Sequence, residues 1–397
     1  MAQGQTFHLL NEKVCTRLKL HGEDVRSLLV KNGWQETDRG HADVIFTNSC
    51  AFLQHVEDEA MDRVQGLEAE KRPEQKIVVF GCLPYINRPR LQQHFQGEII
   101  QTRDVSAFVQ RFNLTPHESR ISYTITRKLN WISRLNQVLN ALFFKDPYFY
   151  YLYEKGRICH LKISEGCLGT CTFCAEKDAR GRLRSRRIDE IVREVERGLK
   201  EGYKIFSFNS DDTGVYGWDN KENIAQLLRK VLAIPADFRL VLTEFNPWGL
   251  IRFQEELVEL LASPKVVFIT VPLQSGSNRI LRLMQRAYKI EDAKAVLRAV
   301  RRKNRSLKIN THMIAGFPGE TEEDFRQSFN LIREFDFNKV KVFKYSDRKE
   351  NASYNLLGKL DQKEIDRRYW TLKGFVLWRA LRHFNLKEFL LNIGFYY

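Results

Sequence analysis

The feature that most constrains this chain is a set of three cysteines within eight residues: Cys167, Cys171 and Cys174. They lie on a glycine-containing loop that follows a predicted strand at His160–Ile163. Their spacing lets three thiolates converge on one metal centre. Iron–sulfur clusters normally use four thiolates, so a set of three leaves one iron open to a ligand from outside the protein. Open coordination positions are where chemistry takes place.

Two other interpretations of these cysteines compete with an iron–sulfur cluster. A structural zinc ion would need a fourth ligand close in sequence, and the nearby candidates are Cys159 and His160. Three inert cysteines in an apolar core are the other possibility, because free cysteine is among the most buried residue types. The spacing favours an iron–sulfur cluster over both.

Composition sets broad limits on the whole chain. Its 397 residues are enough for two or three domains, and 43% hydrophobic content with mixed charges is typical of a soluble globular protein. The net charge of +15 favours a polyanionic or acidic partner. Seven cysteines and the absence of an apolar leader in residues 1–6 predict a reducing cytoplasm. No apolar run is long enough for a membrane span, so no stable membrane insertion is expected.

The first hundred residues alternate short apolar strands with helices, which predicts a parallel α/β sheet. The predicted strands are Phe7–Leu10, Ala42–Thr47 and Lys76–Phe80, and the predicted helices are Glu23–Asn32 and Val56–Glu68. In such sheets ligands lie beyond the carboxyl ends of the strands.

A second set of three cysteines follows these strands. Cys50 and Cys82 come directly after the second and third strands, and Cys15 lies between the first strand and its helix. Any one of them alone is most often a small buried apolar residue. Because all three occur at strand ends, we expect them to meet at one edge of the sheet.

The first cysteine set resembles the signature of the radical S-adenosylmethionine (SAM) superfamily, with Phe173 directly before the last cysteine. In that superfamily SAM chelates the open iron of a [4Fe-4S] cluster. An electron from the cluster then splits SAM, giving a radical that abstracts hydrogen from an unactivated C–H bond. The resemblance implies these roles for Cys167, Cys171 and Cys174, which would be both metal ligands and catalytic residues. The protein's part is to position and shield the cofactor.

Asn48-Ser49-Cys50 and Gly81-Cys82-Leu83 resemble the amino-terminal domain of the methylthiotransferases, a radical SAM family with a second, auxiliary [4Fe-4S] cluster. The resemblance implies that Cys15, Cys50 and Cys82 hold that cluster. Val14 and Leu18 stand where the family has glycine and asparagine, so Cys159 is kept as a substitute for Cys15.

Three further stretches resemble family motifs: Ser210–Gly217, closest to the branch that acts on threonylcarbamoyladenosine in tRNA; Val271–Arg279; and His312–Thr321. They follow predicted strands, where polar groups commonly contact ligands. For Ser210–Gly217 the competing interpretation is an ordinary acidic turn. The basic segment Ala179–Arg186 resembles the family's segment that leads into the first barrel helix, and its competing interpretation is a solvated basic turn. By resemblance the cofactor-binding residues are Phe173, Arg184, Asp211, Asp212, Thr213, Gln274, Ser275 and Gly316. Arg180 is a further candidate to face the cavity.

The expected fold class is α/β. A flavodoxin-like domain at 1–103 would bind the auxiliary cluster, a helical and aromatic connector would follow at 104–156, and a radical SAM partial (β/α)6 barrel would span 157–355. A helical extension would occupy 356–397. The connector, with aromatic Asp146–Tyr153, would pack across two domains or recognise substrate. The helix expected at Asp361–Phe395 would pack on the barrel or lie on a membrane surface.

The resemblance implies a radical SAM methylthiotransferase with two [4Fe-4S] clusters and SAM as cofactors. It would methylate a cluster-bound sulfur and insert a methylthio group into a peptide, protein or tRNA substrate. A peptide is preferred because the family's carboxy-terminal TRAM module is not recognisable in the sequence. A flavodoxin or ferredoxin type of one-electron reductant and a sulfide donor are the expected partners. The alternatives are sulfur insertion or another C–H reaction with a relay cluster, and a non-catalytic zinc or nucleic-acid-binding protein.

Overall fold

The computed structural model describes residues 4–101, 104–116, 122–123 and 158–382. The chain divides into two compact units. The first takes residues from 1–123, 174–182 and 348–351, and the second takes the remainder. Most of the expected connector, including Asp146–Tyr153, and the chain after residue 382 lie outside the described residues. The bounds of the four domains expected from the sequence therefore stay predictions.

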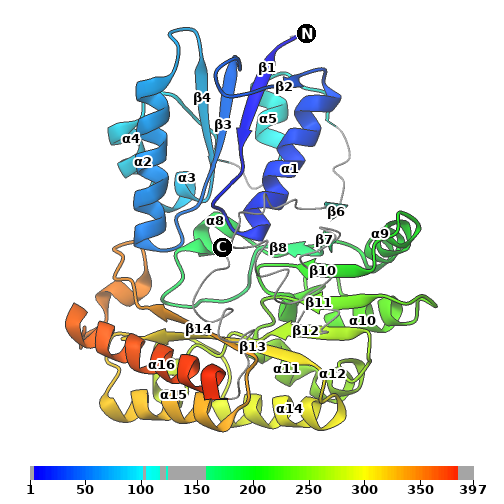
Figure 1. Cartoon of the computed structure of the whole chain (residues 1–397), viewed down its shortest axis with the longest axis vertical. Coiled ribbons are helices and arrows are strands. Elements are labelled where there is room, and N and C mark those ends of the chain that lie inside the picture. The colour runs from blue at the N-terminus through cyan, green and yellow to red at the C-terminus, as the bar shows by residue number, and fades with distance from the viewer. Residues whose placement is uncertain (1–3, 102–103, 117–121, 124–157, 383–397) are drawn as a thin grey trace. The chain divides into compact units, whose positions relative to one another are not determined.

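The first unit is built on a parallel sheet with the strand order β2-β1-β3-β4-β5, the order of flavodoxin-like folds. Its elements are β1 (Thr6–Leu10), α1 (Thr16–Lys31), β2 (Gln35–Glu36), β3 (Val44–Ser49), α2 (Gln54–Glu70), β4 (Lys76–Gly81), α3 (Leu83–Ile86), α4 (Arg88–His94), β5 (Glu98–Ile99), α5 (Ser106–Arg111) and α8 (Glu176–Arg180). Figure 1 shows them in blue and cyan, with α8 in green.

Helices cover both faces of this sheet because its central strands are apolar on both sides. Along β3, Phe46 points to the face covered by α1 and α5, while Ile45 points to the face covered by α2. Successive side chains of a strand alternate between faces, so β4 divides in the same way, with Phe80 on the first face and Val79 on the second. The α2 face also contains the buried Cys50 and Cys82.

The second unit contains a sheet in the order β14-β13-β12-β11-β10-β7 (Figure 1). Its elements are β7 (Ile158–Lys162), β8 (Ser164–Glu165), β9 (Arg184–Ser185), α9 (Ile188–Lys200), β10 (Ile205–Asn209), η1 (Thr213–Val215), α10 (Ile224–Leu232), β11 (Arg239–Leu242), α11 (Pro247–Arg252), α12 (Gln254–Leu260), β12 (Val266–Thr270), α13 (Asn278–Leu283), α14 (Ile290–Lys303), β13 (Lys308–Ala315), α15 (Glu322–Glu334), β14 (Lys339–Lys344), η2 (Ala352–Asn355) and α16 (Gln362–Arg382). The short strand β6 (Ser122–Tyr123) ends the first residue range of the first unit.

The strands β7, β10, β11, β12, β13 and β14 are parallel and follow chain order across the sheet, with a helix between each neighbouring pair. The short strands β8 and β9 form a separate antiparallel pair. Within the described ranges β14 pairs only with β13, so the barrel is open at this edge. Together with the first sheet, this confirms the predicted α/β fold class. None of the helices in the described ranges has the length and apolarity needed to cross a bilayer.

Local sequence explains where several elements begin. Asn223 and Gln226 form a capping box at the start of α10, and Thr321 and Asp324 form another at α15. The first helix begins at Thr16, earlier than the predicted start at Glu23. Cys15 precedes it in an extended conformation, which places this thiol at the amino-terminal end of α1.

Candidate metal centres

The loop at 166–174 is anchored to strand-end segments of the second unit. Gly166 adopts a φ of 81°, and its amide donates to Asp211 Oδ2 at 2.8 Å. Further along, the Thr172 hydroxyl donates to the carbonyl of Leu283 at 2.9 Å. These bonds hold the loop beside the segments that follow β10 and α13.

Two of the thiols on this loop flank a single glycine. A Cβ atom on Gly169 would lie 3.2 Å from Cys167 Sγ and 3.6 Å from Cys171 Sγ, while the Gly169 amide donates to Cys167 Sγ at 3.1 Å. Both thiols are partly exposed, as is that of Cys174, which belongs to the segment of the first unit that leads into α8. The absence of a side chain at Gly169 keeps the space between the two thiols open.

A buried carboxyl group and a partly buried guanidinium lie beside the same two thiols. Asp212 Oδ2 is 3.9 Å from Cys167 Sγ, and Arg286 Nη1 is 3.5 Å from Cys171 Sγ. Asn246 donates to Asp212 at 3.0 Å. Burial raises the pKa of Asp212 to about 6, against the opposing charge of Arg286. The two thiols therefore have one fixed positive charge close by.

Gln274 provides a buried acceptor at the carboxyl end of β12. Its backbone has a φ of 67°, its amide donates to the His312 carbonyl at 2.7 Å, and its own carbonyl accepts from Ile314 at 2.9 Å. Its side-chain Oε1 is buried without a hydrogen-bond partner among the described residues. A buried acceptor of this kind is costly to leave unpaired, so it fits a ligand that brings a donor.

The hydroxyl groups of two predicted cofactor contacts form hydrogen bonds within the protein. Thr213 Oγ1 donates to the Thr243 carbonyl at 2.6 Å. Ser275 Oγ lies 3.2 Å from Ser328 Oγ and accepts from the Ser277 amide at 3.1 Å. Both side chains are fully buried and fix the conformation of their loops. Their contact with a cofactor stays a prediction.

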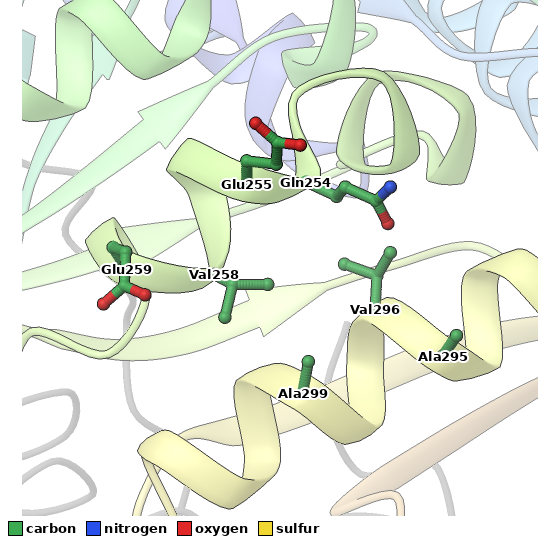
Figure 2. A pocket seen from close by; sticks show the side chains of 7 residues that line it. All are labelled: Gln254, Glu255, Val258, Glu259, Ala295, Val296 and Ala299. Carbon is green, nitrogen blue, oxygen red and sulfur yellow. The ribbon is translucent and has the colours of Figure 1, made fainter.

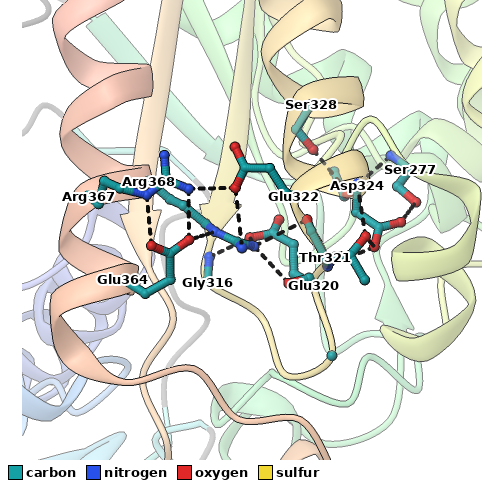
Figure 3. A network of polar contacts seen from close by, with 12 residues as sticks. Ser277, Gly316, Glu320, Thr321, Glu322, Asp324, Ser328, Glu364, Arg367 and Arg368 are labelled. Atoms are coloured by element: carbon teal, nitrogen blue, oxygen red, sulfur yellow. Dashed lines mark hydrogen bonds and ion pairs between the residues drawn. The ribbon is translucent and has the colours of Figure 1, made fainter.

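The Gly316 turn is held by an ion-pair network from α15 and α16 (Figure 3). The Gly316 amide donates to Glu320 Oε2 at 2.9 Å, and Arg368 Nη1 donates to the same oxygen at 2.9 Å. Gly316 has a φ of 81°, and a Cβ atom there would lie 2.6 Å from Ile365 on α16. Only glycine fits this close approach.

The remaining two predicted contacts have structural partners in the second unit. Phe173 is partly buried against an apolar cluster of Ile280, Met284, Ile314, Phe317 and Tyr345. Arg184 on β9 donates to Glu165 at 3.3 Å, and its side chain is half exposed. Their roles toward a cofactor also stay predictions.

The second cysteine set is brought together in the first unit. Cys15 precedes α1, Cys50 follows β3, and Cys82 follows β4, with its amide donating to the Ser49 carbonyl at 2.8 Å. Burial raises the pKa of Cys50 to about 12, and the neighbouring Cys15 adds to this shift. Burial also raises the pKa of Cys82, where Cys50 and Cys15 act in the same direction. The three thiols are therefore electrostatic neighbours, and holding them as thiolates requires a positive centre such as iron.

A partly buried group of ions from α8 and α1 adjoins this set. Arg180 Nη2 lies 3.7 Å from Cys15 Sγ and 2.9 Å from Glu176 Oε1, and Arg17 Nη2 lies 3.4 Å from Glu176 Oε2. The sequence predicted that Arg180 faces a cavity, and it gave no role to Glu176 or Arg17. No local pattern identifies the contacts of Arg180 with Cys15 and of Arg17 with Glu176, because each joins residues more than 150 positions apart.

The spacing of these groups suits a cluster better than a single ion. Within the described ranges, no three Cys, His, Asp or Glu side chains are close enough to hold one metal ion. A [4Fe-4S] cube binds each thiolate at a different iron, so it has no need of single-ion spacing. Cys159 is buried in the core of the second unit, where a Cβ atom on Gly198 would lie 3.5 Å from its sulfur.

An open groove of about 410 Å³ lies elsewhere in the second unit, between α12 and α14 (Figure 2). Gln254, Glu255, Val258 and Glu259 line it from α12, and Ala295, Val296 and Ala299 line it from α14. None of the predicted site residues is among them, so we do not assign the groove a role.

Comparison with known proteins places both cysteine sets in recognised regions. The profile of the Radical SAM superfamily matches residues 161–332, and that of the Uncharacterized protein family UPF0004 matches residues 14–101. A probable threonylcarbamoyladenosine tRNA methylthiotransferase of Pyrococcus horikoshii is 33% identical over 337 residues, covering 84% of this chain and 75% of the relative. The chain belongs to the radical SAM methylthiotransferase family.

Other methylthiotransferases named for two kinds of substrate are similar to the chain. A probable threonylcarbamoyladenosine tRNA methylthiotransferase of Archaeoglobus fulgidus is 36% identical, over 79% of this chain and 70% of the relative. The ribosomal protein uS12 methylthiotransferase RimO of Thermotoga maritima is 32% identical, over 82% of this chain and 73% of the relative. These similarities confirm that the chain is an enzyme that transfers a sulfur-containing group.

A solved structure shares the fold of this methylthiotransferase. The radical SAM methyltransferase TsrM of Kitasatospora setae has a TM-score of 0.58 at 15% identity, covering 87% of this chain and 75% of that one. The cofactors of the methylthiotransferase family are SAM and [4Fe-4S] clusters. Two observations fit these groups: the open space between two thiols at Gly169, and the unpaired acceptor of Gln274.

Proposed function

We propose that this methylthiotransferase modifies a nucleoside of tRNA, replacing hydrogen on an unactivated carbon with a methylthio group. The two separate three-cysteine sets carry this proposal, because the reaction needs one site for cleaving SAM and another for supplying sulfur. The relatives named for threonylcarbamoyladenosine tRNA and the net charge of +15 support an RNA substrate. The sequence-based preference for a peptide substrate has no support in the contacts of the described residues.

In this proposal Cys167, Cys171 and Cys174 hold one cluster. Three thiolates leave its fourth iron for the amino and carboxylate groups of SAM. The bound cofactors supply an electron and a carbon radical for hydrogen abstraction. Asp212, which is buried, lies 3.9 Å from the sulfur of Cys167 at this cluster site.

Gln274 is the residue that we assign to SAM. Its unpaired Oε1 would accept a hydrogen bond from a donor of the cofactor, and the bonds of its backbone to β13 keep it at the strand end. The Gly316 turn, fixed by Glu320 and Arg368, would present its backbone to the same ligand. Phe173, Asp211, Thr213, Ser275 and Arg184 complete the proposed contacts.

Cys15, Cys50 and Cys82 hold the auxiliary cluster in this proposal, and its open iron would accept sulfur from a sulfide donor. Burial raises the pKa of Cys50 and Cys82, and a bound metal would favour the ionised form of these sulfurs. A low-potential one-electron donor of the flavodoxin or ferredoxin class would reduce the enzyme.

The experiment that tests the proposal compares two substrates. The reconstituted protein is incubated anaerobically with SAM, sulfide and a one-electron donor, together with either tRNA carrying threonylcarbamoyladenosine or ribosomal protein uS12. Mass spectrometry of the digests should show a methylthio group on the nucleoside and none on the protein. Methylthiolation of uS12 alone would overturn the RNA substrate, and a thiol product without the methyl group would favour sulfur insertion.

A further inference from the structure

Each cysteine set has one thiol in contact with an arginine guanidinium. Arg286 Nη1 lies 3.5 Å from Cys171 Sγ in the second unit, and Arg180 Nη2 lies 3.7 Å from Cys15 Sγ in the first. Both distances are within hydrogen-bonding range for sulfur. Neither arginine was assigned a role at a cluster from the sequence.

Arg286 is fixed in place by neutral groups. Its Nη2 donates to the Pro272 carbonyl at 2.9 Å, and its guanidinium lies 5.4 Å from the centre of the Tyr288 ring. Tyr288 is itself held by a hydrogen bond to the Leu273 carbonyl at 2.5 Å. The guanidinium is therefore oriented toward Cys171 by Tyr288 and by the segment after β12 that contains Pro272 and Leu273.

The charge of Arg286 is not cancelled by a direct ion pair. Among the described residues, no carboxylate oxygen forms a salt bridge with it. Burial disfavours the charged guanidinium, but Tyr288, Cys171 and Asp212 outweigh this and raise the pKa of Arg286. A full positive charge is thus held within contact distance of the Cys171 sulfur.

The charge of Arg180 is partly balanced. Glu176 pairs with both Arg180 and Arg17, and its carboxylate, 2.9 Å from Arg180 Nη2, offsets part of the charge that faces Cys15. The Arg180 and Arg17 charges lower the pKa of Glu176 despite its burial, which keeps its carboxylate ionised. The first unit therefore has a weaker version of the same arrangement, with its cation against Cys15.

We propose that Arg286 and Arg180 are positioning residues that raise the reduction potential of the cluster bound by their own cysteine set. The inference rests on the proposed function, since it assumes that each set holds a [4Fe-4S] cluster. A low-potential one-electron donor adds one electron to a cluster, and no bond to the protein forms or breaks. A fixed cation beside a ligating sulfur stabilises that added negative charge. Neither arginine changes its protonation.

The test is a redox titration of the anaerobically reconstituted full-length protein, followed by electron paramagnetic resonance. Signals of the two clusters are assigned with variants that lack one cysteine set. The comparison is made at the potential where half of the Cys167 cluster is reduced in wild type. At this potential R286Q should lower the ratio of reduced to oxidised Cys167 cluster about tenfold, which corresponds to a decrease in reduction potential of about 59 mV for one electron. R286K keeps the charge and should recover most of the loss.

R180Q is the matched control. R180Q should leave the ratio of reduced to oxidised Cys167 cluster unchanged and should lower the same ratio for the Cys15 cluster. The decrease should be smaller than the one that R286Q causes at the Cys167 cluster, because Glu176 already offsets part of the Arg180 charge. Iron content should equal that of wild type in all three variants. Unchanged ratios in R286Q at full iron content would overturn the proposal, as would loss of iron in both R286Q and R286K.

The product assay keeps this proposal separate from the proposed function. Shifted potentials in a protein that forms no methylthio product would support the arginine roles and refute the assigned reaction. Methylthio product together with unshifted potentials would support the assigned reaction and refute the arginine roles.

Discussion

The guanidinium of Arg348 lies against the carboxylate of Glu57, and both side chains are almost fully buried. Arg348 also donates to the Ala51 carbonyl at 2.6 Å, directly after Cys50, and Glu57 accepts a second hydrogen bond from Arg90 at 2.8 Å. The short segment at 348–351 therefore fixes the strand end that carries an auxiliary cysteine.

Removing the Arg348 charge should destabilise the first unit. R348M leaves Glu57 buried with less compensation, and breaking a buried pair from one side typically costs about 3–5 kcal/mol. Hydrogen exchange of residues 44–51, followed by mass spectrometry, measures the change. R326A is the control, because Arg326 and Glu323 form an exposed pair worth about 0–1 kcal/mol. Equal exchange in R348M and R326A would contradict the assigned role.

Arg368 should matter for SAM binding although it lies on the last described helix. R368M removes the partner of Glu320 and loosens the Gly316 turn, so we expect the dissociation constant for SAM to rise about tenfold, a loss of about 1.4 kcal/mol. Calorimetry on the reconstituted protein measures it. R367M is the neighbouring control, because Arg367 pairs with the exposed Glu322 and with Glu364. The same loss in both variants would refute a specific effect of Arg368 on the turn.

The docking of α16 should weaken at acid pH. The hydrogen bond from Arg367 lowers the pKa of Glu364 to about 2, against an ordinary value of about 4.3 for an unfolded chain. A depressed carboxyl pKa adds stability above the unfolded value, and this contribution is lost as pH falls from about 4.3 to about 2. Trp370 and Trp378 fluorescence should report the change. E364Q should show a weaker acid transition, and an identical transition would exclude Glu364 as its origin.

A side chain at Gly169 should displace one cluster only. G169V would fill the space between Cys167 and Cys171, so the reconstituted protein should lose about four of its eight irons. G374A is the control, because a Cβ atom on Gly374 meets nothing within 4 Å. Full iron content in G169V would show that the cluster does not need this space.

The strands and cysteines were predictable because their signals are local. The predicted strand Lys76–Phe80 differs from β4 by a single residue at its end, since a short apolar run before a glycine marks a buried strand. The predicted start of α1 was wrong by several residues, because Cys15 is not among the usual capping residues and gives no sign that a helix begins.

The charged groups around the thiols could not be found in this way. Arg286 is 115 positions from Cys171, and Arg348 is 291 positions from Glu57. Such contacts depend on how strand ends approach one another in the folded chain, and an isolated arginine in a sequence is most often solvated. The unpaired Oε1 of Gln274 likewise appears only once its loop is folded, although the resemblance of the surrounding segment had singled the residue out.

The most direct test of the account is the iron and acid-labile sulfide content of three anaerobically reconstituted proteins. These are wild type, the triple alanine variant of Cys167, Cys171 and Cys174, and the triple alanine variant of Cys15, Cys50 and Cys82. Two independent [4Fe-4S] clusters predict about eight irons in wild type and about four in each variant. About four irons in wild type, unchanged when Cys15, Cys50 and Cys82 are removed, would contradict the auxiliary cluster and the sulfur-transfer chemistry assigned to it.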